Sequence, residues 1–76
     1  MNKKIPKNFI ENELKKINKR YKNLDPKKNY FEQGMDSLDF FTLIFFIEKK
    51  FKIKISSKNY KSLNTTYKIQ KYLKNK

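Results

Sequence analysis

The chain has 76 residues and a net charge of +13, with 20 Lys and Arg residues against 7 Asp and Glu residues. A chain of this length forms one small domain, residues 1–76, which depends on packing alone because it lacks cysteine and hence disulfides. Because histidine is absent as well, we expect no metal site.

The first predicted element is a helix from about Lys7 to Arg20. The basic stretch before it, "MNKKIPKNF", lacks the apolar segment of a secretory signal, and Pro6 suits a helix start. Apolar side chains then recur at helical spacing, with Phe9 beside them: Ile10, Leu14, Ile17 and Tyr21. The segment "NLDPKKN", residues 23–29, indicates a turn, and a loop continues to Gly34.

The most apolar segment predicts a second helix from about Ser37 to Phe51. Its buried face has the helical spacing of Phe40, Leu43, Ile44, Ile47 and Phe51. A second apolar stripe points away from that face and consists of Leu38, Phe41 and Phe45. This stripe either packs beneath the long loop or forms an exposed docking patch. The run "FFTLIFFI" is too short to cross a bilayer, so we expect no membrane span and a cytoplasmic protein.

The remaining third of the chain, after Phe51, is predicted to form a loop and two further helical segments. In "KIKISSKN" the side chains of Ile53 and Ile55 are expected to point inward, before a short helical turn near Lys58 to Ser62. Asn64 and Thr65 are suitable cap residues. The last helix has an inner face of Thr66, Ile69, Tyr72 and Leu73. The chain is therefore predicted to be an all-α bundle of four helices, with a long loop before the second and a short third helix.

Ser37 lies at the start of the second helix, within "EQGMDSLDFF". Asp36 can cap this helix, Asp39 three residues on resembles a capping box, and Gly34 can adopt a turn conformation open to glycine. Ser37 is then either a tolerated first-turn residue or an attachment point for a phosphodiester, which the positive end of the helix dipole would favour. A nucleophilic hydrolase is not indicated, because there is no histidine to act as its base.

The segment "GMDSLD" followed by "FFTLIFFIEKKFKIKI" resembles the acyl carrier proteins, whose hallmark is Gly-x-Asp-Ser-Leu at the start of the second helix. The resemblance extends from about Ile5 to Leu73. Phe51 matches the helix-ending Phe of the family, and "LNTT" matches the residues that open its last helix. The resemblance implies a four-helix fold with a long first loop.

The resemblance also implies that Ser37 receives 4'-phosphopantetheine from a phosphopantetheinyl transferase, with Asp36 presenting the serine and Gly34 shaping the loop. The thiol of that arm would carry an acyl group as a thioester, so the protein would be a carrier and not an enzyme. Its other partners would be an acyl-loading ligase or synthase and downstream acyltransferases, and we expect a monomer. The residues implied in docking these partners are Leu38, Asp39, Phe41, Phe45 and Glu48.

Several positions depart from the family pattern. Thr42, Lys49 and Lys50 stand where family members have acidic residues, and Gln33 replaces a Leu. Phe40 and Phe46 stand where many members have smaller residues, which predicts a short or polar cargo, or one held outside the bundle. These departures favour a specialised lipid or secondary biosynthetic pathway over general fatty-acid synthesis. A D-alanyl or aminoacyl carrier is the near alternative.

The high positive charge suggests a second class of function, a small basic nucleic-acid binder. Tyrosines among the lysines could stack on bases: Tyr21, Tyr30, Tyr60 and Tyr67. However, these tyrosines are scattered along the chain, and no nucleic-acid-binding motif is present. The lysine excess, with its many Asn, Ile, Tyr and Phe residues, is also typical of AT-rich coding sequences. We therefore expect a carrier with no nucleic-acid partner.

Overall fold

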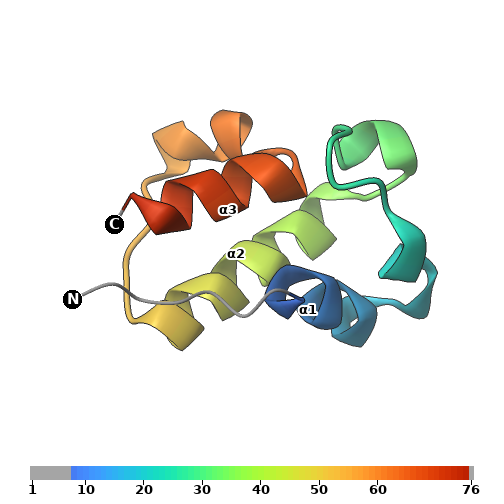
Figure 1. Cartoon of the computed structure of the whole chain (residues 1–76), viewed down its shortest axis with the longest axis horizontal. Coiled ribbons are helices and arrows are strands. Elements are labelled where there is room, and N and C mark those ends of the chain that lie inside the picture. Colours follow the sequence, from blue (N-terminus) through green and yellow to red (C-terminus); the bar gives the residue numbers. More distant parts are fainter. Residues whose placement is uncertain (1–7, 76) are drawn as a thin grey trace.

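The computed structural model describes residues 8–75, which contain helices and no strand. The helices are α1 (Phe9–Ile17), η1 (Lys19–Asn23), η2 (Phe31–Gln33), α2 (Ser37–Phe51), η3 (Ser57–Leu63) and α3 (Thr66–Lys74), where η denotes a 3-10 helix. With α1, α2, η3 and α3 as the four main segments, the predicted all-α bundle is confirmed (Figure 1). No helix among the described residues is long and apolar enough to cross a membrane.

The first predicted helix is wrong at its C-terminal end. α1 stops at Ile17, because Asn18 adopts an extended conformation with φ −160° and ψ 130°. The Asn18 side chain then accepts a hydrogen bond of 3.0 Å from the backbone N–H of Arg20, which starts η1. An Asn side chain competes with the helix for backbone donors in this way. The predicted start, Lys7 after Pro6, lies outside the described residues.

The long loop before α2 is ordered by hydrogen bonds within itself and to α3. The Gln33 side chain accepts from the backbone N–H of Asp25 at 2.7 Å and donates to the carbonyls of Asp25 and Lys28 at 3.0 and 3.2 Å. Tyr30 is fully buried, and its hydroxyl shares a hydrogen bond of 2.7 Å with Oγ1 of Thr66. The polar side chain of Gln33 thus stabilises the turn through hydrogen bonds to its backbone.

The predicted bounds of α2, Ser37 to Phe51, are confirmed. Its N-terminus is capped by Asp36, whose carboxylate accepts a hydrogen bond of 2.8 Å from the backbone N–H of Asp39. The helix ends at Phe51, and the next residue, Lys52, adopts a left-handed conformation with φ 55° and ψ 48°. Such a residue commonly ends helices and turns the chain away.

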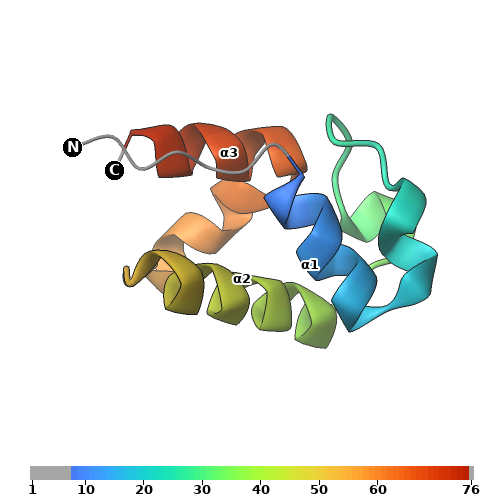
Figure 2. The same ribbon diagram turned by 60° about the horizontal axis from the view of Figure 1, so that its bottom comes forward.

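The core lies between α2 and the other helices. The five residues predicted for the buried face of α2 are all buried. The same buried cluster includes Phe9, Ile10, Leu14, Leu63, Ile69 and Leu73. Figure 2 shows α2 and α3 along opposite edges of the molecule, with α1 and η3 between them. The predicted inward positions of Ile53 and Ile55 are also confirmed, since Ile55 is buried and Ile53 packs against the core.

The last helix begins as the sequence predicts. Thr65 caps α3 by accepting a hydrogen bond of 3.0 Å from the backbone N–H of Lys68. The predicted inner face is buried at Thr66, Ile69 and Leu73, and Tyr72 packs partly buried against the core. This arrangement leaves the N-terminal end of α2 at one end of the bundle, beside the long loop (Figure 1).

Candidate functional site

Ser37 is the first residue of α2, and its side chain is exposed. Its hydroxyl forms no hydrogen bond with another described residue. The positive end of a 15-residue helix lies at this point, where the first backbone N–H groups favour an anion. A phosphodiester attached to the Ser37 oxygen would therefore have both space and favourable electrostatics, so the residues present fit a phosphopantetheine group.

Gly34 shapes the approach to Ser37 through its backbone conformation. It has φ 98° and ψ 7°, which is left-handed, and its N–H donates to the carbonyl of Phe31 at 3.2 Å to close η2. A side chain with a Cβ is strained in this conformation, although no atom lies within 4 Å of the space a Cβ would occupy. The backbone conformation, and not close packing, is therefore the requirement for glycine.

A network of three side chains joins η1 to the start of α2. The Tyr21 hydroxyl donates a hydrogen bond to Oδ2 of Asp39. Nη2 of Arg20 donates to the Gly34 carbonyl at 3.1 Å and to the Tyr21 hydroxyl oxygen at 3.3 Å. Burial, together with the hydrogen bond to Asp39, raises the pKa of Tyr21 above its ordinary value of 10.0. This network holds the loop and the first turn of α2 together.

This network also corrects the predicted capping box. Asp36 supplies one half of it, but the Asp39 carboxylate turns to Tyr21. The reciprocal hydrogen bond to the backbone N–H of Asp36 is not found among the described residues. From the sequence, Tyr21 was expected only at helical spacing on the first helix and Arg20 had no predicted role, because nothing local connects them to residues 34 and 39.

The second apolar stripe of α2 is exposed and does not pack beneath the loop. The exposed fractions are 75% for Leu38, 50% for Phe41 and 54% for Phe45. The ring centroids of Phe41 and Tyr60 are 5.7 Å apart, so Tyr60 of η3 borders the stripe. Three large apolar side chains on one exposed helix face, next to Ser37, form a surface suited to another molecule.

The two acidic residues predicted to dock partners both bond within the chain. Asp39 accepts from Tyr21, and Oε2 of Glu48 accepts from the backbone N–H of Ile55 at 2.8 Å. Both residues are only partly exposed. Each carboxylate therefore stabilises a connection of the fold, and a docking role for either residue stays a prediction.

An aromatic cluster connects the core to the exposed stripe. Its central ring belongs to Phe40, which is 2% exposed. Four rings surround it at centroid distances of 5.3 to 6.3 Å: Tyr30, Phe31, Phe41 and Tyr60. Because Tyr21 and Tyr30 are buried in the fold, they cannot stack on nucleic-acid bases. Two of the four tyrosines considered for base stacking from the sequence are therefore not available for it.

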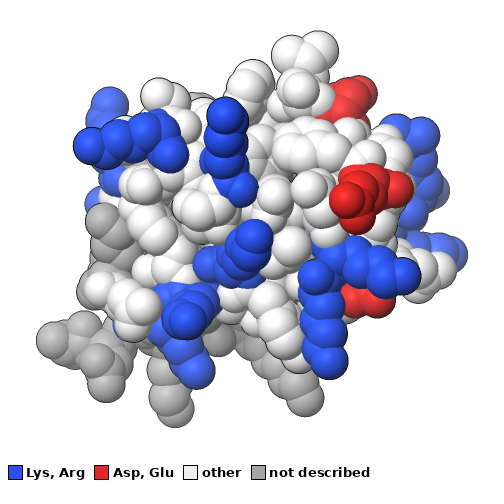
Figure 3. All heavy atoms as spheres, turned by 90° about the horizontal axis from the view of Figure 1, so that it is seen from above, with Lys and Arg blue, Asp and Glu red and all other residues white. Residues whose placement is uncertain are grey.

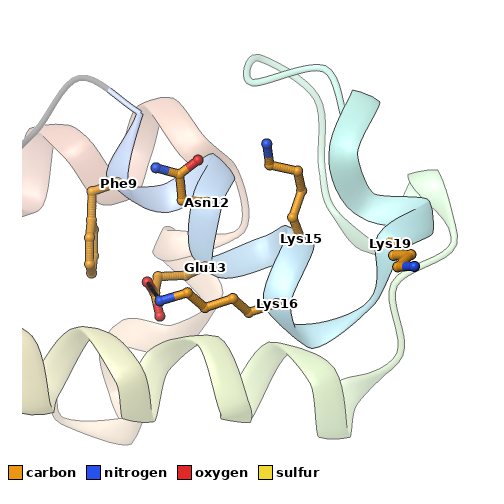
Figure 4. Close-up of a pocket in the computed structure, with 6 residues that line it drawn as sticks. All are labelled: Phe9, Asn12, Glu13, Lys15, Lys16 and Lys19. Atoms are coloured by element: carbon orange, nitrogen blue, oxygen red, sulfur yellow. Dashed lines mark hydrogen bonds and ion pairs between the residues drawn. The ribbon is translucent and has the colours of Figure 1, made fainter.

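A surface hollow of about 600 Å³ lies along α1, apart from Ser37 (Figure 4). Its lining residues are Phe9, Asn12, Glu13, Lys15, Lys16 and Lys19. Glu13 and Lys16 point toward one another and form an ion pair of 3.2 Å. The hollow contains none of the residues predicted for the site.

The class of protein, a carrier domain, follows from the all-α fold together with a comparison with known families. The family model described as "Phosphopantetheine attachment site" matches residues 9–73, so the chain belongs to this family, as its resemblance to the acyl carrier proteins implied. Domains of this family carry covalently attached 4'-phosphopantetheine, which confirms the predicted cofactor. They work with a phosphopantetheinyl transferase and with biosynthetic enzymes. No significant match was found among curated proteins or solved structures.

Proposed function

We propose that the chain is an acyl carrier protein and that Ser37 is its attachment residue. The observation that carries this proposal is the position of Ser37, exposed at the capped N-terminus of α2, on the helix whose exposed stripe is Leu38, Phe41 and Phe45. Within the matched region, this serine combines an exposed hydroxyl with a helix N-terminus that favours an anion. The other serines of the chain are Ser56, Ser57 and Ser62.

The proposed roles of the neighbouring residues follow from their contacts. Asp36 holds the first turn of α2 through its cap, which keeps the Ser37 hydroxyl at the surface. Gly34 allows the turn that leads into this cap. When attached, the arm would supply a thiol that holds an acyl group as a thioester. The chain itself would add no catalytic group, so Ser37 would be the substrate of the transferase.

The packing around Phe40 supports a short or polar cargo. Interiors packed to nearly solid density have no room for an additional chain unless side chains move. Here the buried ring of Phe40 is in contact with the rings of Phe31 and Tyr60. The cargo would then stay outside the bundle, as in a specialised lipid or secondary pathway. D-alanyl or aminoacyl carriage is compatible with the same packing.

The partners proposed beyond the transferase are an acyl-loading ligase or synthase and acyltransferases, which would dock on the exposed stripe of α2. A monomeric state and a cytoplasmic location remain predictions.

The test is incubation of the full chain with a phosphopantetheinyl transferase and coenzyme A, followed by intact-mass measurement. The wild type and Ser57→Ala should gain one phosphopantetheine, whereas Ser37→Ala should gain none. Modification of Ser37→Ala would refute the assignment.

A further inference from the structure

The exposed stripe of α2 ends in a positive charge. Lys49 follows Leu38, Phe41 and Phe45 at helical spacing, and its Nζ lies 5.5 Å from the ring centroid of Phe45. The contact is a cation–π interaction, which leaves the ammonium at the surface beside an exposed ring. The stripe thus presents three apolar side chains followed by a cation on one face.

Acidic groups do not balance this cation. The nearest carboxylate along the helix is Glu48, and it is engaged by the backbone of Ile55. Residues 49–76 contain ten lysines and no Asp or Glu. Figure 3 shows lysines spread over the face that carries η3 and α3, while acidic side chains gather at one end of that face. The charged side chains that follow Glu48 in the sequence are therefore all cationic.

We propose that the proteins that act at Ser37 present a carboxylate-rich rim to the Lys49 end of α2, next to an apolar groove that receives Leu38, Phe41 and Phe45. This inference rests on the proposed function of Ser37. The charge on the partner is set by complementarity, because like charges placed opposite each other would oppose docking. The partner would thus recognise the far end of α2 by its positive charge.

The geometry brings Lys49 within the reach of such a partner. Twelve residues separate it from Ser37, which is about 18 Å along a helix. A typical protein interface covers about 800 Å² of each partner and hence spans about 30 Å. An enzyme that docks on the exposed stripe with its active site at Ser37 therefore also covers Lys49.

A protein is favoured over an anionic membrane because the apolar stripe and the cation are continuous with the Ser37 site on one helix. An enzyme that modifies Ser37 must contact its hydroxyl, whereas binding to a membrane surface requires no contact with this residue. The membrane interpretation makes a different prediction: the charge of Lys49 would then matter for lipid binding and not for the modification of Ser37.

The experiment uses the phosphopantetheinyl transferase of the same organism as the probe, with the full chain and coenzyme A. We expect Lys49→Glu to lower kcat/KM for modification about tenfold, and we expect the wild-type rate to fall as salt is raised. Lys71→Glu on α3 is the matched control, because it changes the net charge equally on the opposite edge of the molecule. It should change kcat/KM less than about threefold. Circular dichroism checks that both variants are folded.

A second measurement follows sedimentation of the same proteins with vesicles of phosphatidylglycerol and phosphatidylcholine. An unchanged or faster rate for Lys49→Glu, or equal losses in both variants, would overturn the inference. So would loss of vesicle binding by Lys49→Glu with an unchanged modification rate, which would assign the cation to a lipid surface. In each of these cases the proposed function stands, because Ser37 is still modified. Failure of the wild type to gain the group would instead contradict the proposed function.

Discussion

The hydroxyl of Tyr21 donates a hydrogen bond to the carboxylate of Asp39 across 18 residues of sequence. Arg20, next to Tyr21, donates to the carbonyl of Gly34. The two contacts tie η1 to the loop and to the first turn of α2, and so they fix both sides of the segment that presents Ser37. Asp39 therefore contributes to the position of this segment, whatever it contributes to docking.

Tyr21→Phe should destabilise the protein. The substitution keeps the buried ring but removes the hydroxyl, which leaves Asp39 and Arg20 without this partner. We expect a loss of about 1–3 kcal/mol in the free energy of unfolding, measured in urea. Tyr67→Phe is the control, because Tyr67 is 53% exposed, and it should change the stability by less than about 0.5 kcal/mol. Equal effects in the two variants would show that the network adds nothing to stability.

Stability should decline at alkaline pH through Tyr30. Burial raises the pKa of Tyr30 well above its ordinary value of 10.0, so the folded state favours the neutral phenol. The contribution of the neutral Tyr30 phenol to the free energy of unfolding is complete below pH 10. It is lost as the pH rises further, because Tyr30 loses its proton at a lower pH in the unfolded state than in the folded state. Tyr30→Phe should weaken this decline, as measured by urea unfolding across the range. An unchanged slope in the variant would contradict this prediction.

The exposed stripe and the core beneath it should respond differently to truncation. Phe40→Ala removes a buried ring and should cost about 3–5 kcal/mol. Phe45→Ala removes a ring that is 54% exposed, so it should cost much less in urea unfolding and still lower partner turnover. Phe41→Ala should fall between the two, because its ring also contacts Phe40 and Tyr60. A loss near 4 kcal/mol at Phe45 would show that the stripe belongs to the core.

The length of an attached acyl group should have little effect on the melting temperature. A cargo bound inside the native fold stabilises it, whereas a cargo held in solvent does not. Ser37 can be loaded with short and long acyl-phosphopantetheines, and the melting temperatures compared. Stabilisation that grows with acyl length would refute a cargo held outside the bundle. A length dependence found only in Phe40→Ala would support the view that Phe40 closes the interior.

The parts of the fold predicted correctly are those encoded by local signals. The bounds of α2 follow from the Asp36 cap and the helical spacing up to Phe51, and the start of α3 follows from Thr65. The exposure of Leu38 could be predicted only with the help of the family resemblance. From the residues alone, burial under the loop was equally compatible with the pattern.

The missed features are hydrogen bonds of side chains, which hydrophobic periodicity does not reveal. Asn18 interrupts the predicted helix because its side chain accepts a hydrogen bond from the backbone N–H of Arg20, two residues further on. Gln33 appeared as a departure from the family, but its amide closes the loop on Asp25. The link from Tyr21 to Asp39 requires the loop to fold back on α2, and no short motif encodes this arrangement.

The central claim is that Ser37 bears the phosphopantetheine group. The most direct measurement is proteolysis of the modified full chain, followed by tandem mass spectrometry to locate the added group. Four serines are candidates in this sequence: Ser37, Ser56, Ser57 and Ser62. The account predicts the group on Ser37 alone, at one per chain. Its presence on any of the other three serines, with Ser37 unmodified, would contradict the account.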